Sequence, residues 1–424
     1  MNNVYFIDSI YALLGSLSLF LTCSTAYFVT RSVFSPAVIF PLTWAIALLF
    51  LSCVTPFLGF YQITSWSIVV FVTGGMLFSV VSCIITKVFH INEKVFFSMT
   101  LDDIDYAGIV KFFYVGVLLT SPVVFVALMN YGDDIVQIAS RIRYERIHGE
   151  GNITPGVVQN WFLLAFFLIF IIFAGVLKGK VKLLYVVFPI VVTLVLYLIL
   201  EGRSSIIMQV FAWFFLMVYI KNGIGLKGLG FVTSALLFFI VLGSFFVSKV
   251  KVNDMTIMQE FFLYLKHILS YLYQGPILFS RYYDGSINIR ENWNALNSFF
   301  HILKNLGLYS GDISQHADFR RFGYGADDVG NVYSIYFSIL PHYTYIGACF
   351  FITIYSMIAT VFYNLSRFGG VFSLYVSGIL FSSSLLSVFM DGFGYLLYFF
   401  MKIFIFFMLI NVFFNKKIKL GFKK

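Results

Sequence analysis

Long apolar runs separated by short polar segments are the dominant pattern of this chain. A helix rises about 1.5 Å per residue, so about 20 apolar residues are enough to cross the hydrocarbon core of a bilayer. Runs of this length recur from one end of the sequence to the other. We therefore predict an all-α polytopic integral membrane protein with about 11 (10–12) transmembrane helices. The predicted spans are roughly residues 7–28, 34–56, 64–86, 110–130, 160–177, 183–200, 204–220, 229–248, 335–362, 371–389 and 395–414.

One further apolar stretch, residues 261–280, is interrupted by polar and helix-breaking residues. It contains Lys266 and His267 near its start and Gln274 and Pro276 near its end. We predict an interfacial or re-entrant segment there, because lipid does not tolerate exposed polar backbone. If this stretch spanned the membrane instead, the N-terminal half of the chain would be inverted.

The spacing of the spans divides the chain into three parts. Residues 1–248 form a predicted N-terminal bundle of transmembrane helices, and residues 335–424 form the last helices and a basic tail. Between them, residues 249–334 are the longest hydrophilic segment, which we predict to be a large loop with interfacial helices.

Composition supports the membrane class and narrows the partners. With 60% hydrophobic and 11% charged residues and a mean hydropathy of +0.92, the chain has more apolar surface than a soluble fold can bury. The formal net charge of +9 is divided between many loops, so we expect no nucleic-acid partner. All four cysteines fall within apolar runs, which predicts neither a disulfide framework nor a zinc site. The first run lacks the features of a cleaved signal peptide, so we expect a retained helix.

Lysines and arginines occupy alternate loops. Lysines are concentrated in one set of loops and in the C-terminal tail, whereas the other set carries mainly arginines. Lysine-rich loops face the cytoplasm in most membrane proteins, so the C-terminus is predicted to be cytoplasmic and the N-terminus, by parity, to be outside. Asp102, Asp103 and Asp105 then lie on the cytoplasmic side, where we expect them to cap or solvate the start of the fourth helix.

The arginines on the outer side indicate an anionic substrate. An arginine side chain is planar, permanently charged and able to bind pyrophosphate or carboxylate through two parallel hydrogen bonds. Three outer regions contain such residues: 131–159, the hairpin 201–205 and the long segment 249–334. Arg203 stands at the predicted start of a helix, where the helix dipole already favours anions.

Short motifs in these regions resemble one membrane-protein family. The hairpin Gly202-Arg203-Ser204-Ser205, the large loop before the last helices and the helix entry Asn331-Val332-Tyr333-Ser334 resemble the Wzy-type O-antigen polymerases, also called oligosaccharide repeat unit polymerases. The likeness covers the plan of the whole chain, but its motifs fall mainly within residues 201–347. In many relatives an Asp-x-Gly-x-x-Gly pattern follows; the corresponding stretch here, 342–347, keeps only its last glycine. No catalytic role is therefore assigned to His342.

This resemblance implies a GT-C-like architecture and a specific reaction. Such proteins are bacterial inner-membrane glycosyltransferases that polymerise undecaprenyl-pyrophosphate-linked oligosaccharide repeat units for lipopolysaccharide. The leaving group of their glycan donor is a lipid pyrophosphate, so the resemblance implies neither a metal nor another cofactor. The sequence also shows no nucleotide-binding glycine loop. The implied partners are the lipid-linked oligosaccharide, the membrane lipids and a chain-length regulator.

The reaction needs charge neutralised on the leaving pyrophosphate and a proton removed from the attacking hydroxyl. Arginines can supply the first without a metal. We assign Arg203, His316 and Asp318 as catalytic, with Asp327 and Asp328 behind the two candidate bases. The expected pyrophosphate- and substrate-binding residues are Arg141, Arg143, Arg146, Arg281, Arg290, Arg320 and Arg321, and the expected sugar-stacking residues are Tyr282, Tyr283, Trp293 and Tyr324.

Other interpretations of the same residues stay open. Arg203 can anchor a helix end at the interface, the arginines of 131–159 can bind anionic lipid, and Arg320 with Arg321 can be a solvated pair. An O-antigen ligase has a similar plan and chemistry. A lipid-linked oligosaccharide flippase is a second alternative, although a transport protein should favour charges along a central cavity over a large outer loop. A solute permease is a third alternative, for which the intramembrane charges Asp391 and Lys402 are the relevant feature.

Overall fold

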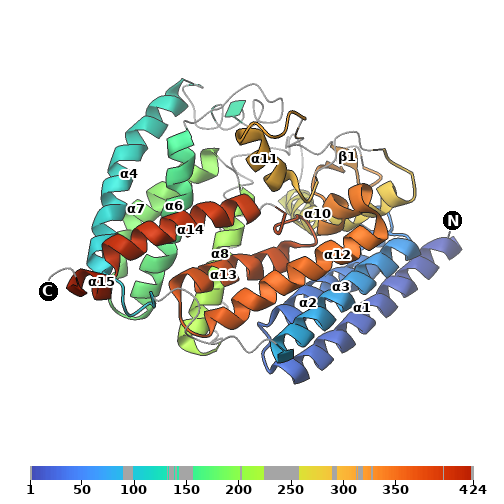
Figure 1. The fold of residues 1–424 in the computed structure, drawn as a ribbon. Coiled ribbons are helices and arrows are strands. Elements are labelled where there is room, and N and C mark those ends of the chain that lie inside the picture. The colour runs from blue at the N-terminus through green and yellow to red at the C-terminus, as the bar shows by residue number, and fades with distance from the viewer. Residues whose placement is uncertain are drawn as a thin grey trace. The chain divides into compact units, whose positions relative to one another are not determined.

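The computed structural model describes residues 2–88, 99–130, 132, 138, 141–142, 156–200, 203–223, 257–288, 294–311, 313, 319–325, 328–394 and 396–421. Within these ranges nearly all regular structure is helical, as predicted (Figure 1). The exception is one antiparallel pair of two-residue strands, β1 (Arg320–Arg321) and β2 (Val329–Gly330). The described helices are α1 (Asn2–Thr30), α2 (Pro36–Leu58), α3 (Ser65–Val88), α4 (Tyr106–Met129), α6 (Gly156–Leu177), α7 (Leu183–Leu200), α8 (Arg203–Lys221), α10 (Ile257–Tyr283), α11 (Asn297–Asn305), α12 (Ile335–Ser366), α13 (Val371–Leu386), α14 (Leu396–Phe414) and α15 (Lys416–Gly421).

The predicted multi-pass membrane protein is confirmed by helix length and hydropathy. Seven of the described helices are long and apolar enough to cross a bilayer, namely α1, α2, α3, α4, α6, α12 and α14. The helices α7, α8 and α13 contain shorter apolar segments. The predicted span at 229–248 lies outside the described residues, so the total of about eleven spans stays a prediction.

The stretch 261–280 forms part of one continuous helix of 27 residues, α10, which contains Pro276. It is not among the helices that meet the length and hydropathy of a span. Its interfacial or re-entrant placement therefore stays a prediction, and the structure shows that the backbone of this segment is helical.

Local sequence explains where several helices begin and end. Pro36 is in the first turn of α2, where its missing N–H costs nothing, and Gly59 ends that helix in the left-handed conformation (φ 69°). Asp105 caps α4, because its carboxylate accepts a hydrogen bond from the Gly108 N–H at 3.1 Å. This contact confirms the expected capping role for Asp105, whereas Asp102 and Asp103 pair with Lys178 and Lys417.

The chain divides into two compact units, each assembled from separate stretches of sequence. Unit 1 comprises Met1–Asn92, Val252–Asn364 and Leu380–Phe399, and unit 2 comprises Glu93–Lys251, Leu365–Ile379 and Phe400–Lys424. The predicted three-part division by position along the chain is not tested by this grouping. It shows only that each unit combines N-terminal with C-terminal residues.

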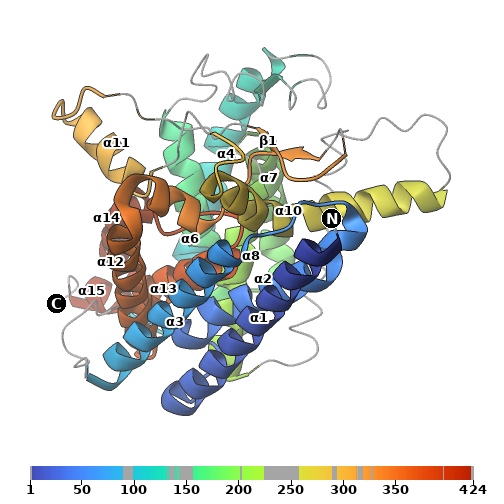
Figure 2. The ribbon, with the colours of Figure 1, turned by 90° about the vertical axis from the view of Figure 1, so that its right-hand side faces the viewer.

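In unit 1, α1, α2 and α3 pack against one another, and Figure 2 shows them side by side. The helix α12 runs parallel to α3. Three hydrogen bonds join the two helices: Tyr336 donates to the Phe71 carbonyl (3.4 Å), Ser356 to the Phe78 carbonyl (2.7 Å) and Thr360 to Ser82 (2.6 Å). Residue numbers increase in the same direction along both helices, so the helices are parallel. Trp44 is fully buried in this unit, and its indole N–H donates to Ser387 at 3.0 Å.

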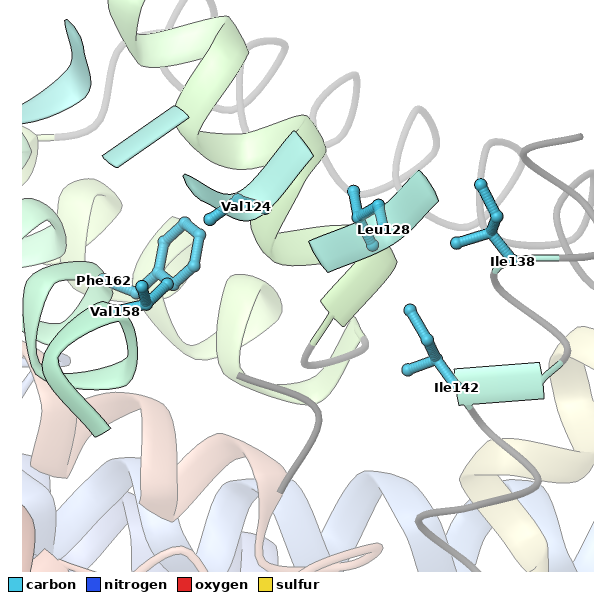
Figure 3. Close-up of a cluster of buried hydrophobic side chains, with 6 residues drawn as sticks. All are labelled: Val124, Leu128, Ile138, Ile142, Val158 and Phe162. Carbon is cyan, nitrogen blue, oxygen red and sulfur yellow. The ribbon is translucent and has the colours of Figure 1, made fainter. Parts of the chain in front are cut away.

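Unit 2 is built from α4, α6, α7 and α8 with parts of α13 and α14. Tyr375 is fully buried between the rings of Phe167 and Phe170 and donates its hydroxyl proton to Gln209 at 3.2 Å. A second buried cluster joins α4 to α6 (Figure 3). Its members are Val124, Leu128, Ile138, Ile142, Val158 and Phe162.

Contacts between loops agree with the sides that the lysine and arginine pattern assigns. In unit 2, Thr100 forms a backbone bridge with Gly370, and two ion pairs of 3.0 Å, Lys178–Asp102 and Lys417–Asp103, join segments that are all predicted to be cytoplasmic. In unit 1, Phe60 bridges Gly323, which joins two segments predicted to be outside. An inverted N-terminal half would place the α2–α3 loop and residues 319–325 on opposite sides, so this bridge argues against inversion.

Gly275 offers a test of the packing in unit 1. A Cβ atom at this position would lie 2.3 Å from the Val388 carbonyl oxygen and 3.1 Å from the Ser334 nitrogen, and backbone atoms cannot easily move away. We expect Gly275→Ala to destabilise the protein by about 1–3 kcal/mol. Thermal unfolding in detergent, followed by tryptophan fluorescence, measures the change.

The matched control for this test is Gly156→Ala at the start of α6, where an added Cβ meets nothing within 4 Å. Equal unfolding midpoints for the two variants would show that α10 does not pack closely against the start of α12.

Candidate functional site

One end of unit 1 brings together three of the predicted substrate-binding arginines. We call it the arginine end and define it by residues 59–64, Arg281 and residues 319–325. The segment 319–325 is attached to the α2–α3 loop through two backbone hydrogen bonds, from Tyr61 N–H to the Phe322 carbonyl (3.0 Å) and from Tyr324 N–H to the Gly59 carbonyl (2.9 Å). The buried rings of Phe60 and Phe322 meet edge to face beneath this connection, with centroids 5.2 Å apart.

Arg281 connects α10 to this segment. It lies in the last turn of α10, and its guanidinium group donates to the Arg321 carbonyl at 2.8 Å. The same group lies over the ring of Tyr61, 4.1 Å from its centroid, which is a close cation–π contact. Arg320 and Arg321 form β1, where Arg320 is half-buried and Arg321 is exposed. Arg281 is therefore largely engaged in holding the segment, whereas Arg321 presents its side chain to the surroundings.

The ion pair between Lys266 and Asp328 forms the base of this end. Lys266, from the first half of α10, approaches the carboxylate of Asp328 to 2.8 Å and also lies over the ring of Phe60. The side chain of Asp328 is only 8% exposed and accepts a further hydrogen bond from the Gly325 N–H at 2.9 Å. Asp328, which was expected behind the candidate bases, is thus occupied by structural contacts. Asp327 lies outside the described residues.

The four predicted sugar-stacking residues differ in how open their rings are. Tyr282 packs edge to face against Phe337, and Tyr283 stacks on Phe279 while meeting Tyr345 edge to face. Tyr324 is 60% exposed and meets Tyr61 edge to face at 4.5 Å. Tyr324 is therefore the stacking candidate whose ring is most accessible at the arginine end. Trp293 lies outside the described residues.

The remaining predicted site residues are distributed as follows. Arg203 opens α8 at the predicted helix start, although the position of its side chain is not described. Arg141 is exposed and belongs to unit 2, as does Arg203. Arg143, Arg146, Arg290, His316 and Asp318 lie outside the described residues. The structure thus brings together Arg281, Arg320 and Arg321, and the placement of the proposed bases stays a prediction.

A second polar centre in unit 1 surrounds Asp391, in the turn between α13 and α14. Its carboxyl group accepts hydrogen bonds from the Ser338 hydroxyl (2.5 Å) and from the backbone N–H groups of Phe393 (3.1 Å) and Gly394 (2.9 Å). Burial raises the pKa of Asp391 to about 6, and the hydrogen bonds from Ser338 and the two N–H groups oppose this rise. The sequence indicated Asp391 only as an intramembrane charge. Its contact with Ser338, 53 residues away, could not be predicted from a local pattern.

The helix α12 is broken beside this centre. Thr344 has φ 58° and ψ −175°, a conformation that is costly for a β-branched residue, and Pro341 precedes it. The predicted single span at 335–362 is therefore two helical segments joined at Thr344. Lys402, the other intramembrane charge indicated by the sequence, donates to the Asn160 side chain at 2.8 Å in unit 2.

Two further observations bear on chemistry and relationships. Among the described residues there is no group of three or more His, Cys, Asp or Glu side chains that could hold a metal ion. Comparison of the chain with models of known protein families, with curated proteins and with solved structures finds no match. Function is therefore argued from the residues themselves.

The Lys266–Asp328 ion pair should hold residues 319–325 against the α2–α3 loop. Asp328→Ala removes the partner of Lys266 and the acceptor of the Gly325 N–H, so we expect residues 319–325 to detach from the α2–α3 loop at a cost of about 1–3 kcal/mol. Hydrogen exchange at the Tyr61 and Tyr324 amides measures the detachment.

Asp284→Ala is the matched control, because Asp284 is an exposed acid just after α10. Among the described residues, its carboxylate accepts a hydrogen bond only from the nearby Ser286 N–H. Unchanged protection of both amides in Asp328→Ala would show that the ion pair does not hold this segment.

Proposed function

We propose that this protein is an O-antigen polymerase, a glycosyltransferase of the outer face of the bacterial inner membrane. In this proposal it transfers a growing glycan from its undecaprenyl-pyrophosphate carrier to a new lipid-linked repeat unit. The observation that carries the proposal is the arginine end of unit 1, where Arg281 holds β1 through the Arg321 carbonyl, and where Arg321 and Tyr324 are both exposed. A membrane-embedded chain that gathers arginines beside an exposed aromatic ring is suited to an anionic, sugar-bearing lipid.

The chemistry assigns distinct tasks to these groups. When the glycosidic bond to pyrophosphate breaks, negative charge develops on the leaving oxygens, and preorganised cationic donors stabilise that charge. Arg321 and Arg203 are the proposed donors, and Arg281 is proposed to position β1 through its hydrogen bond to the Arg321 carbonyl. His316 or Asp318 is the proposed base for the attacking hydroxyl. A chain-length regulator is the proposed protein partner.

Two other functions remain candidates on specific grounds. An O-antigen ligase performs the same chemistry but transfers the glycan to the lipid A core. A flippase or other transporter is favoured by the broken helix α12 next to the buried Asp391, because discontinuous helices and buried acids are common in transporters.

Loss of the arginine donors should stop elongation. Arg321→Ala and Arg203→Ala each remove one proposed donor, and loss of one such donor costs about 2.7–4 kcal/mol of barrier, or a rate loss of about 100- to 1,000-fold. We expect each variant to insert normally but to leave the lipopolysaccharide core with a single repeat unit. A glycolipid gel of complemented deletion cells shows the ladder.

Lys304→Ala is the matched control, because Lys304 is an exposed cation on α11 and is assigned no role. A normal ladder in Arg321→Ala and Arg203→Ala would rule out the assignment of these arginines. In the deletion strain itself, long lipid-linked polymer without ligation would indicate the ligase, and repeat units confined to the inner leaflet would indicate the flippase.

A further inference from the structure

The carboxyl group of Asp391 is buried, and no cation of the described residues lies beside it. Its residue is 4% exposed, and its hydrogen-bonding contacts are the Ser338 hydroxyl at 2.5 Å, the Phe393 and Gly394 N–H groups and, at 3.5 Å, the Tyr355 hydroxyl. Buried carboxylates are ordinarily paired with a positive charge, because an unpaired ion in a low-dielectric interior is costly. No Lys, Arg or His of the described residues pairs with this one.

The groups that face Asp391 are polar but neutral. Helix α12 contributes Ser338 and Tyr355, and Tyr343 lies one contact further away, where it donates to Asn294 at 2.5 Å. The segment 294–298 contributes Ser298, which donates to the Gly394 carbonyl, and α13 contributes Ser383 beside Gly392. The titratable groups in this surrounding are thus the two tyrosines, which are neutral at physiological pH.

Hydrogen-bond accounting at Ser338 points to a proton on Asp391. The Ser338 oxygen lies 2.5 Å from the Asp391 carboxyl oxygen and 2.8 Å from the Ile335 carbonyl oxygen. A hydroxyl group has one proton and can donate to only one of these two acceptors. If Asp391 carries a proton, it can donate to Ser338, which then donates to Ile335. Both short contacts are hydrogen bonds only in this arrangement.

We propose that Asp391 is a proton-binding site whose protonated carboxyl group holds together a latch in unit 1. The latch consists of Asp391, Gly394, Ser338 and residues 294–298. Ser298 donates to the Gly394 carbonyl at 2.6 Å, and the Ala295 N–H donates to the Ser338 carbonyl at 3.0 Å, so both sides of the Asp391–Ser338 contact hold the segment that precedes α11. The ligand of this site is a proton, and its binding does not depend on the proposed glycosyl transfer.

The break in α12 gives the latch a mechanical consequence. Ser338 lies in the short first segment of α12, before Pro341 and the strained Thr344. This segment is held to the rest of unit 1 by tertiary contacts, because the helix backbone is interrupted after it. Loss of the proton leaves a buried carboxylate with no described cation as its partner, which weakens the contact between this segment and the α13–α14 turn.

The direction of the pH dependence follows from the burial of Asp391. Because burial raises its pKa to about 6, the folded latch binds the proton more tightly than an exposed carboxyl group, with an ordinary pKa of about 3.9, does. The latch is therefore complete below the ordinary pKa, and its stability is lost as the pH rises through about 6.

The test compares the full-length protein with Asp391→Asn in lipid nanodiscs between about pH 3.5 and pH 8. An asparagine accepts the two backbone N–H groups and donates to Ser338 as the protonated acid does, so it keeps the latch closed at every pH. Asp284→Asn, at an exposed acid, is the matched control. The measurements are the infrared carbonyl band of a protonated carboxyl group and hydrogen exchange at the Ala295 amide, which donates to the Ser338 carbonyl.

We expect wild type and Asp284→Asn to show a carboxylic-acid band that disappears as the pH rises and is missing in Asp391→Asn. The wild-type exchange rate relative to Asp391→Asn at the same pH should be near one below about pH 4, rise as the pH increases from about 4 to about 6, and level off at about 100-fold by pH 8. Absence of the band at pH 5, or equal exchange in the two proteins at every pH, overturns the proposal. Asp391→Ala, which lacks a donor to Ser338, should expose the Ala295 amide at all pH values.

Discussion

The constraint on which this structure depends is that a bilayer offers no partners to backbone N–H and C=O groups. Each described span is therefore a helix that pairs its own backbone, and the exception among the candidate spans is the break at Thr344 inside α12. The ion pairs Lys178–Asp102, Lys417–Asp103 and Lys266–Asp328 all lie outside the candidate spans. The ion pairs of the described residues are thus absent from the candidate spans, whereas Lys402 lies within α14 and donates to the uncharged side chain of Asn160.

The two kinds of basic residue serve different purposes under this constraint. Lysines in unit 2 form ion pairs that connect the loop before α4 with the α6–α7 turn and with the C-terminal helix. In unit 1, Arg281 instead donates to a backbone carbonyl and stacks on Tyr61, and it shares no described carboxylate. Arginine suits this arrangement because its flat guanidinium group can stack and donate hydrogen bonds at the same time. The proposed substrate site therefore depends on an arginine that holds the strand from which Arg321 projects.

Sequence patterns predicted the helices well and the contacts between distant residues poorly. The predicted span 160–177 corresponds to Gly156–Leu177, and the predicted 110–130 to Tyr106–Met129, because run length alone determines what can cross a bilayer. The break at Thr344 was missed, since Pro341 is tolerated within membrane helices and the surrounding residues stay apolar. The Lys266–Asp328 and Asp391–Ser338 contacts join residues 62 and 53 positions apart, and no local pattern encodes such pairs.

The most direct test of the proposed function uses the purified protein in nanodiscs with a synthetic lipid-pyrophosphate-linked repeat unit. Mass spectrometry of the products follows the joining of repeat units and the release of free lipid pyrophosphate. A polymerase should form a ladder of joined units and release one lipid pyrophosphate for each new linkage, with chelator present throughout. Folded protein that leaves the repeat unit unchanged, or that moves it between leaflets without joining it, would contradict the account.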